Sequence, residues 1–152
     1  MDRGYKEQCE LVIRQIKKLI GAYRERIKHL DISESEFWVW YILNAKDGEI
    51  TQQDICRAWS LPKQTVNTII TQLKSNGFLQ LEAIPGTKNH KVIRLTDAGR
   101  AYSEDMLLPF SQAEERAFSR TPDDDIALVT RVFGKYIEVI KEELNGTTGE
   151  NA

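Results

Sequence analysis

The residues best suited to chemistry lie in a run of twelve positions, 63–74. Apolar residues recur there at steps of 3, 1 and 3, which predicts a helix with one buried face. The opposite face carries amide, hydroxyl and ammonium groups and no carboxylate. Gln and Asn can bond bidentately to adenine, Thr can contact a thymine methyl group, and Lys can reach guanine or phosphate. The candidate base and phosphate contacts are Lys63, Gln64, Thr65, Asn67, Thr68, Thr71 and Lys74.

The alternative interpretation of this face is an ordinary solvated surface. Solvated helices usually include Glu or Asp, as the two ends of this chain do. The charge distribution also favours contact with an anion. Residues 51–100 hold seven basic and three acidic residues, whereas residues 101–152 hold five and eleven, and the first fifty hold nine of each. The middle third is therefore the only basic part of a chain whose net charge is −2.

Two short helices must position this face. Thr51 to Asp54 resembles a capping box and predicts the start of a short helix, so Thr51 and Gln52 join the candidate contacts. Ser60 to Pro62 then predicts a tight corner before the helix at 63–75. A short helix, a turn and a second helix at this spacing are typical of a helix-turn-helix. Another capping-box pattern, Ser33 to Glu36, precedes a strongly apolar helix.

A β-hairpin is predicted directly after the helix-turn-helix. Asn76-Gly77 ends the helix, and residues 78–84 and 91–95 have the pattern of two strands. The turn between them is basic and contains no acid. In a winged helix the second helix enters the major groove, while the hairpin reaches phosphates or the minor groove. The hairpin residues predicted to contact DNA are Lys88, Asn89, His90 and Lys91.

Long amphipathic helices are predicted at both ends. Residues 9–30 carry a heptad-like apolar stripe, and Thr121-Pro122 predicts the start of a helix with a second such stripe. A further helix starts after Thr96, where Pro109 predicts a kink or a break near Leu108. These stripes favour a homodimer whose two chains interlock through both ends. An intramolecular helical bundle is the alternative.

The predicted fold is mainly α with a small β-hairpin wing, an α+β class. A winged helix-turn-helix core over residues 32–99 is flanked by dimerisation helices over 1–31 and 100–145, and residues 146–152 are predicted to form a disordered tail.

Between about Ile32 and Gly99 the sequence resembles the MarR family of bacterial winged-helix transcription regulators. Four motifs in order carry this resemblance: Thr51-Gln52-Gln53-Asp54-Ile55, Lys63-Gln64-Thr65-Val66-Asn67, Leu73-Lys74-Ser75-Asn76-Gly77-Phe78-Leu79 and Leu95-Thr96-Asp97-Ala98-Gly99.

The resemblance implies an obligate homodimer that binds a pseudo-palindromic double-stranded DNA operator, most often as a repressor. It also implies release by a small molecule or an oxidant that acts between the dimerisation helices and the winged lobe. The chain departs from the family pattern at Pro62, where the family often has Ser, and at Thr68, where it often has Arg. The wing's usual acidic residue and arginine are replaced within Thr87-Lys88-Asn89. The operator sequence of a relative is therefore not expected to apply.

The effector site is predicted from aromatic residues and one histidine, which would line a cleft between the first, second and fifth helices. A purely structural core is the alternative for these residues. Cys9 offers a different response, peroxide sensing with Tyr23 nearby, although Cys9 also continues the apolar stripe. The candidate ligand-binding residues are Tyr23, His29, Trp38, Tyr41 and Phe110.

Other classes of function find little support in the sequence. Two cysteines 47 positions apart and two histidines provide no metal-site spacing, so neither metal nor cofactor is expected. No phosphate loop, GxSxG elbow or HExxH motif is present, which argues against an enzyme. The lack of a leader or a long apolar run predicts a cytoplasmic protein without a membrane span. A winged-helix adaptor that binds only proteins is the remaining alternative.

Overall fold

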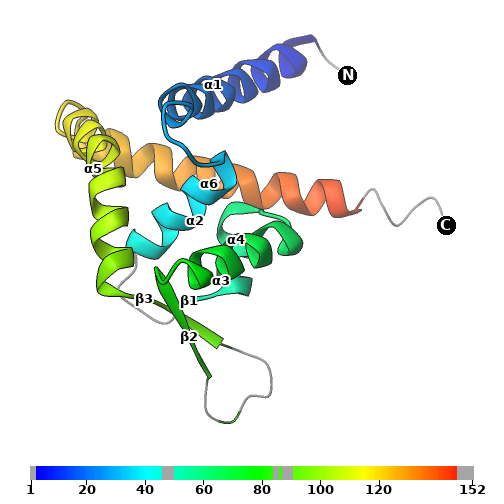
Figure 1. Ribbon diagram of the computed structural model, residues 1–152. Coiled ribbons are helices and arrows are strands. Elements are labelled where there is room, and N and C mark those ends of the chain that lie inside the picture. Colours follow the sequence, from blue (N-terminus) through cyan, green and yellow to red (C-terminus); the bar gives the residue numbers. More distant parts are fainter. Residues whose placement is uncertain (1–2, 46–49, 84–85, 87–90, 147–152) are drawn as a thin grey trace. The chain divides into compact units, whose positions relative to one another are not determined.

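The computed structural model describes residues 3–45, 50–83, 86 and 91–146. The chain divides into two compact units, Met1–Met106 and Leu107–Ala152, which are described separately. The mainly helical class with a small antiparallel sheet is confirmed (Figure 1). The elements are α1 (Arg3–Ile27), α2 (Glu34–Ala45), β1 (Ile50–Thr51), α3 (Gln52–Trp59), α4 (Lys63–Ser75), β2 (Leu79–Ala83), β3 (Lys91–Leu95), α5 (Asp97–Phe118) and α6 (Asp123–Gly146).

The sheet has three antiparallel strands in the order β1-β3-β2. The predicted hairpin is present, with Leu79 opposite Leu95 and Ala83 opposite Lys91. The short strand β1 was not predicted from the sequence. It pairs Ile50 with Ile93 on the other edge of β3. β1 therefore ties the start of α3 to the hairpin.

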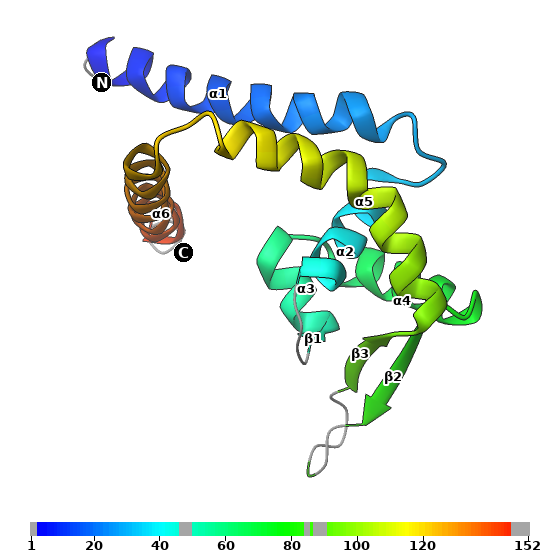
Figure 2. The ribbon, with the colours of Figure 1, turned by 90° about the vertical axis from the view of Figure 1, so that its left-hand side faces the viewer.

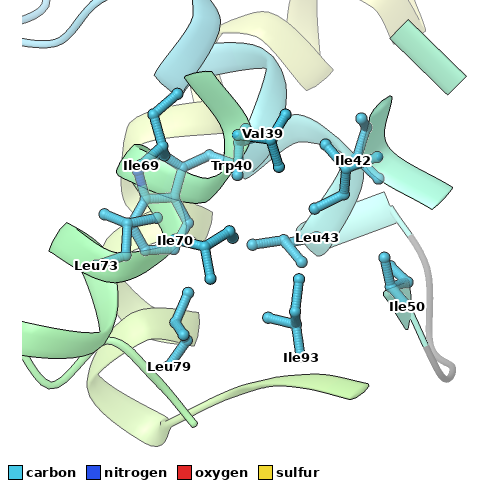
Figure 3. Packing of buried hydrophobic residues seen from close by; sticks show 12 residues of the cluster. Val39, Trp40, Ile42, Leu43, Ile50, Ile69, Ile70, Leu73, Leu79 and Ile93 are labelled. Carbon is cyan, nitrogen blue, oxygen red and sulfur yellow. The ribbon is translucent and has the colours of Figure 1, made fainter. Parts of the chain in front are cut away.

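The core of the first unit forms around the apolar face of α4. Val66 and Ile70 are fully buried there, with Ile69 and Leu73 almost so. Leu43 of α2 packs in the same cluster. Figure 3 shows the other side chains that close it, Trp40 and Val39 from α2, and Leu79 and Ile93 from the sheet. Because one face of α4 is used in this way, its opposite face must point away from the core.

The start of α3 and the turn before α4 follow local signals in the sequence. Thr51 caps α3 through a complete capping box, in which its hydroxyl accepts from the Asp54 backbone N–H and the Asp54 carboxylate accepts from the Thr51 backbone N–H. Ser60 then adopts the left-handed conformation, with φ 50° and ψ 34°. Pro62 precedes the first turn of α4 and offers no side-chain oxygen as a cap. The tight corner predicted between the two helices is thus confirmed.

The junction between the hairpin and α5 depends on a close backbone approach. The Thr96 backbone N–H donates to the Phe78 carbonyl at 3.0 Å, and the Thr96 hydroxyl donates to the Gly77 carbonyl at 2.7 Å. The same hydroxyl oxygen accepts from the Gly99 backbone N–H at 3.1 Å. A Cβ atom on Gly99 would lie 1.9 Å from the Phe78 carbonyl oxygen. Position 99 therefore has no room for a Cβ atom, and only glycine fits there.

Three predicted helix boundaries need correction. α1 ends at Ile27, short of Leu30, because the backbone N–H groups of His29 and Leu30 bond to carbonyls three residues back, in tight turns that replace the α-helical pattern. Of the kink or break predicted near Leu108, the break is excluded, because α5 continues through Pro109; a proline removes only one helical hydrogen bond and the flanking turns remain. Thr121 does not cap α6, which starts at Asp123, because the Thr121 hydroxyl donates back to the Ala117 carbonyl.

The predicted tail lies outside the described residues, except for Gly146, which is the last residue of α6.

α1 is held to α2 by an ion pair and by aromatic contact. The Arg24 guanidinium donates to both carboxylate oxygens of Glu34, at 2.8 and 3.1 Å. This hydrogen bond lowers the pKa of the Glu34 carboxyl and raises the pKa of Arg24. Tyr23 and Trp38 lie beside the pair with their ring centroids 5.4 Å apart, and Ile27 is buried.

We expect Gly99→Ala to destabilise the first unit by about 1–3 kcal/mol or more, because the added methyl group would force the hairpin and α5 apart. Urea unfolding followed by circular dichroism measures the change. The matched control is Gly21→Ala in α1, where a Cβ meets no atom within 4 Å. Alanine favours helix, so the control should gain about 0.5–1 kcal/mol. An unchanged unfolding midpoint for Gly99→Ala would contradict the close approach.

The Arg24–Glu34 pair predicts a dependence of stability on pH. The pKa of Glu34 is lower in the folded than in the unfolded chain, so the pair stabilises the protein above the unfolded pKa of about 4.3. That contribution is lost as the pH falls through the folded pKa. We expect Glu34→Gln to unfold at a lower urea concentration than the wild type at pH 7, with the difference shrinking at pH 3. Glu104→Gln on the exposed surface of α5 is the control. A difference of equal size at both pH values would rule out the ion pair as its cause.

Candidate nucleic-acid interface

The outward face of α4 gathers the candidate contacts that were predicted from the sequence. Every residue of the predicted face is exposed, whereas the added candidate Thr65 is half-buried. Two hydroxyls on this face bond to the helix itself, Thr68 to the Gln64 carbonyl at 3.0 Å and Thr71 to the Asn67 carbonyl at 2.8 Å. The amides of Gln64 and Asn67 and the ammonium groups at the two ends of α4 complete a surface without carboxylates. Such a surface suits the edges of bases and phosphate.

At the start of α3, the two predicted contacts Thr51 and Gln52 are less exposed than those on α4. The Thr51 hydroxyl is engaged in the capping box, where it also donates to Asp54 Oδ2 at 2.7 Å, and Gln52 is half-buried. Gln53 and Arg57 are the more exposed polar side chains of α3. The sequence reasoning missed both of them, although a helical wheel placing Ile55 inside would have pointed them outward. Arg57 lies 3.9 Å from Asp54, in an ion pair at the surface.

The β2–β3 hairpin extends away from the helices of the first unit (Figures 1 and 2). Lys91 is exposed at the start of β3, as the prediction requires. The other predicted wing contacts, Lys88, Asn89 and His90, lie outside the described residues. In the stem, Arg94 Nε donates to Glu82 Oε2 across the two strands at 3.1 Å. The paired part of the hairpin, β2 and β3, therefore contains an ion pair between Arg94 and Glu82.

This geometry defines the class of fold. α3 and α4 form a helix-turn-helix with a left-handed turn, and an antiparallel hairpin follows directly and packs on the same core. That arrangement is a winged helix-turn-helix.

An aromatic cluster lies where α1, α2 and α3 meet. It brings together three of the predicted ligand-binding residues, Tyr23, Trp38 and Tyr41. Trp59 at the end of α3 was missed, and it stacks on Trp38 with centroids 4.2 Å apart and planes inclined by 17°. Phe37 packs edge-on against Trp38. The cluster therefore connects the first helix to the helix-turn-helix.

The other two predicted ligand-binding residues do not join the aromatic contacts described above. His29 is exposed in the turn that follows α1. Phe110 is buried, but it belongs to the second unit and is described with that unit alone.

Cys9 is exposed on α1. Tyr23 of the same chain lies fourteen residues further along the helix, roughly 21 Å away at 1.5 Å per residue. Tyr5, four residues before Cys9 on the same helix, is the tyrosine of α1 that lies nearest to it in sequence.

Neither a metal site nor a membrane span is evident in the described part of the chain. Within residues 3–45, 50–83, 86 and 91–146, no three His, Cys, Asp or Glu side chains are grouped to hold a metal ion. None of the helices in these ranges is both long and apolar enough to cross a bilayer.

Comparison with known proteins places the winged lobe in a family. A family model described as MarR family matches residues 30–88. The structure of NMB1585, a MarR family regulator from Neisseria meningitidis, is 26% identical with a TM-score of 0.74, covering 95% of this chain and 99% of that one. The S. aureus MepR–DNA complex is 19% identical with a TM-score of 0.60, covering 90% and 97%.

A third similar structure concerns regulation of DNA binding of Bordetella bronchiseptica BpsR by 6-hydroxynicotinic acid. It is 20% identical with a TM-score of 0.61, covering 84% of this chain and 90% of that one. No curated protein matches the sequence.

Residues 30–88 thus match the MarR family model, and the fold of the chain is similar to that of a MarR family regulator. This confirms the resemblance found in the sequence.

Proposed function

We propose that this protein is a cytoplasmic transcriptional regulator, most simply a repressor, that binds a pseudo-palindromic operator as a homodimer. The single observation that carries the proposal is the outward face of α4, which is exposed, rich in amides and hydroxyls, and free of carboxylates. The winged helix-turn-helix fold supplies the means of presenting that face to the major groove. A similar structure solved as a complex with DNA supports the same use of the fold.

The homodimer is supported by the apolar surface of α6. Seven large aliphatic side chains of this helix are between 37% and 67% exposed, and over its described length, Asp123–Gly146, no residue is buried. A soluble monomer rarely leaves so much contiguous apolar surface in water. These residues are Leu128, Val129, Val132, Ile137, Val139, Ile140 and Leu144.

Charge complementarity supports a second copy as the partner. α1 carries seven basic and three acidic residues and leaves Leu11, Ile13 and Leu19 exposed. α6 carries three basic and six acidic residues. Opposite charges beside apolar stripes favour packing of α1 of one chain with α6 of another.

A small molecule is proposed to release the operator through the aromatic cluster of Tyr23, Trp38, Tyr41 and Trp59. The cluster spans the first helix and the helix-turn-helix, so a ligand that altered the Trp38–Trp59 stack would act on the position of α3. Regulation of BpsR by 6-hydroxynicotinic acid is a precedent for an aromatic acid in a protein of similar fold.

The proposal is tested by selecting genomic fragments with the purified protein and titrating the enriched duplex by fluorescence anisotropy across salt. We expect affinity in about the nanomolar range for a two-fold-symmetric site, falling steeply with salt. Equally weak binding to all duplexes, with and without the candidate effectors, would instead support the alternative that the protein is a winged-helix adaptor that binds only proteins.

On the enriched duplex, Asn67→Ala should cost about 1–3 kcal/mol, roughly 5- to 150-fold in affinity, because the amide that bonds bidentately to a base is removed. Its specificity should relax at one base pair in each half-site. Lys74→Ala should weaken all duplexes alike and lower the slope of log K against log salt by about 0.9 for each phosphate that the protein no longer neutralises. Gln15→Ala on α1 is a control for removal of an exposed amide. Equal decreases in affinity for specific and random DNA with both α4 variants would refute the assignment.

Val129 is 65% exposed on α6, so Val129→Glu tests the dimer. If this surface is buried against a partner, an unpaired carboxylate there should weaken dimerisation by more than about tenfold. Sedimentation equilibrium measures the change. Ala127→Glu adds the same charge at an exposed position two residues earlier, on nearly the opposite side of α6 from Val129, and should leave the dimer intact. A monomeric wild type, or equal effects of the two variants, would argue against this interface.

A further inference from the structure

Thr68 and Thr71 present an unusual chemical surface within the outward face of α4. Both side chains are exposed, and each hydroxyl donates to the carbonyl four residues earlier in the helix. The hydroxyl proton is therefore already used inside the protein. The remaining heavy group on each Cβ is a methyl group, which is free to meet a ligand.

The bond to the backbone is common for threonine in helices, and Thr130 of α6 makes the same bond to the Ile126 carbonyl at 2.9 Å. What distinguishes Thr68 and Thr71 is their setting. They lie three positions apart on a polar face, one beside Asn67 and the other a helical turn further on. A methyl group exposed on such a surface lacks an apolar partner in the free protein.

The major groove offers one apolar group among its base edges, the 5-methyl of thymine. Residues three apart in a helix are separated by roughly 4.5 Å along the axis, close to the roughly 3.4 Å rise of a base pair. Two methyl groups with this spacing suit thymines at neighbouring or next-neighbouring base pairs.

We propose that the γ-methyl groups of Thr68 and Thr71 determine specificity by contacting the 5-methyl groups of thymines in each half-site. This inference rests on the proposed function and assigns a particular chemical feature of the operator to two side chains. It differs from recognition by hydroxyl donation, because the hydroxyl protons are committed to the Gln64 and Asn67 carbonyls.

The test removes single methyl groups from the DNA and from the protein. Each thymine of the enriched duplex is replaced in turn by deoxyuridine, symmetrically in both half-sites. Burial of a methyl group is worth about a fourfold change in affinity, so replacement at a contacted position should weaken binding of the dimer by about fifteenfold. At uncontacted thymines the affinity should stay the same.

The matched protein variants separate the methyl group from the hydroxyl. Thr68→Ser keeps the hydroxyl and removes the methyl, so it should bind the thymine duplex about fifteenfold more weakly and weaken little further with deoxyuridine. Thr68→Val keeps a methyl group and should retain both affinity and sensitivity to deoxyuridine. With the same two substitutions at Thr71, the deoxyuridine replacement to which binding becomes insensitive should lie at a different thymine. Melting curves establish that each variant is folded.

Selective binding that ignores every deoxyuridine replacement, or weaker binding with Thr68→Val but not with Thr68→Ser, would overturn this inference alone. Failure of the wild type to prefer any duplex would overturn the proposed function and this inference with it.

Discussion

The burial of one face of α4 is the constraint on which the remainder of the winged lobe depends. Val66, Ile70 and Leu73 leave water only if α2 and the sheet close over them, and this requirement brings together segments that are distant along the chain. Once that face is buried, the rotation of α4 about its axis is determined. The direction in which each side chain of the other face leaves the helix is then also determined. A change in the core would therefore redirect the outward face as a whole.

Local signals made much of this fold predictable. The bounds of α4 follow from Pro62 and Asn76-Gly77, and the start of α3 follows from the Thr51–Asp54 box, because the hydrogen bonds involved connect residues close in sequence. Thr121 shows the limit of such signals. Its hydroxyl could donate to a carbonyl at the end of α5 or accept from a backbone N–H at the start of α6, and the sequence does not indicate which bond forms.

The features that escaped prediction depend on contacts between distant residues. β1 has only two residues, too few to show alternation, and it exists because Ile50 meets Ile93. In the sequence, Trp59 is one apolar residue at the end of a short helix, and nothing nearby indicates its partner. Its stack on Trp38 forms only when α2 and α3 come together. The candidate face on α4 was predictable because it lies on one helix. The aromatic cluster was predictable only in part because it needs three helices.

The stack of Trp38 and Trp59 has an optical consequence. Two of the three indoles of the chain lie with centroids 4.2 Å apart and nearly parallel, whereas Trp40 is fully buried in the core. Electronic transitions of rings so close together couple, and the resulting exciton band in the circular dichroism spectrum depends on their mutual orientation. The junction between α2 and α3 therefore contains an intrinsic chromophore pair, whose signal reports the position of the helix-turn-helix without any attached label.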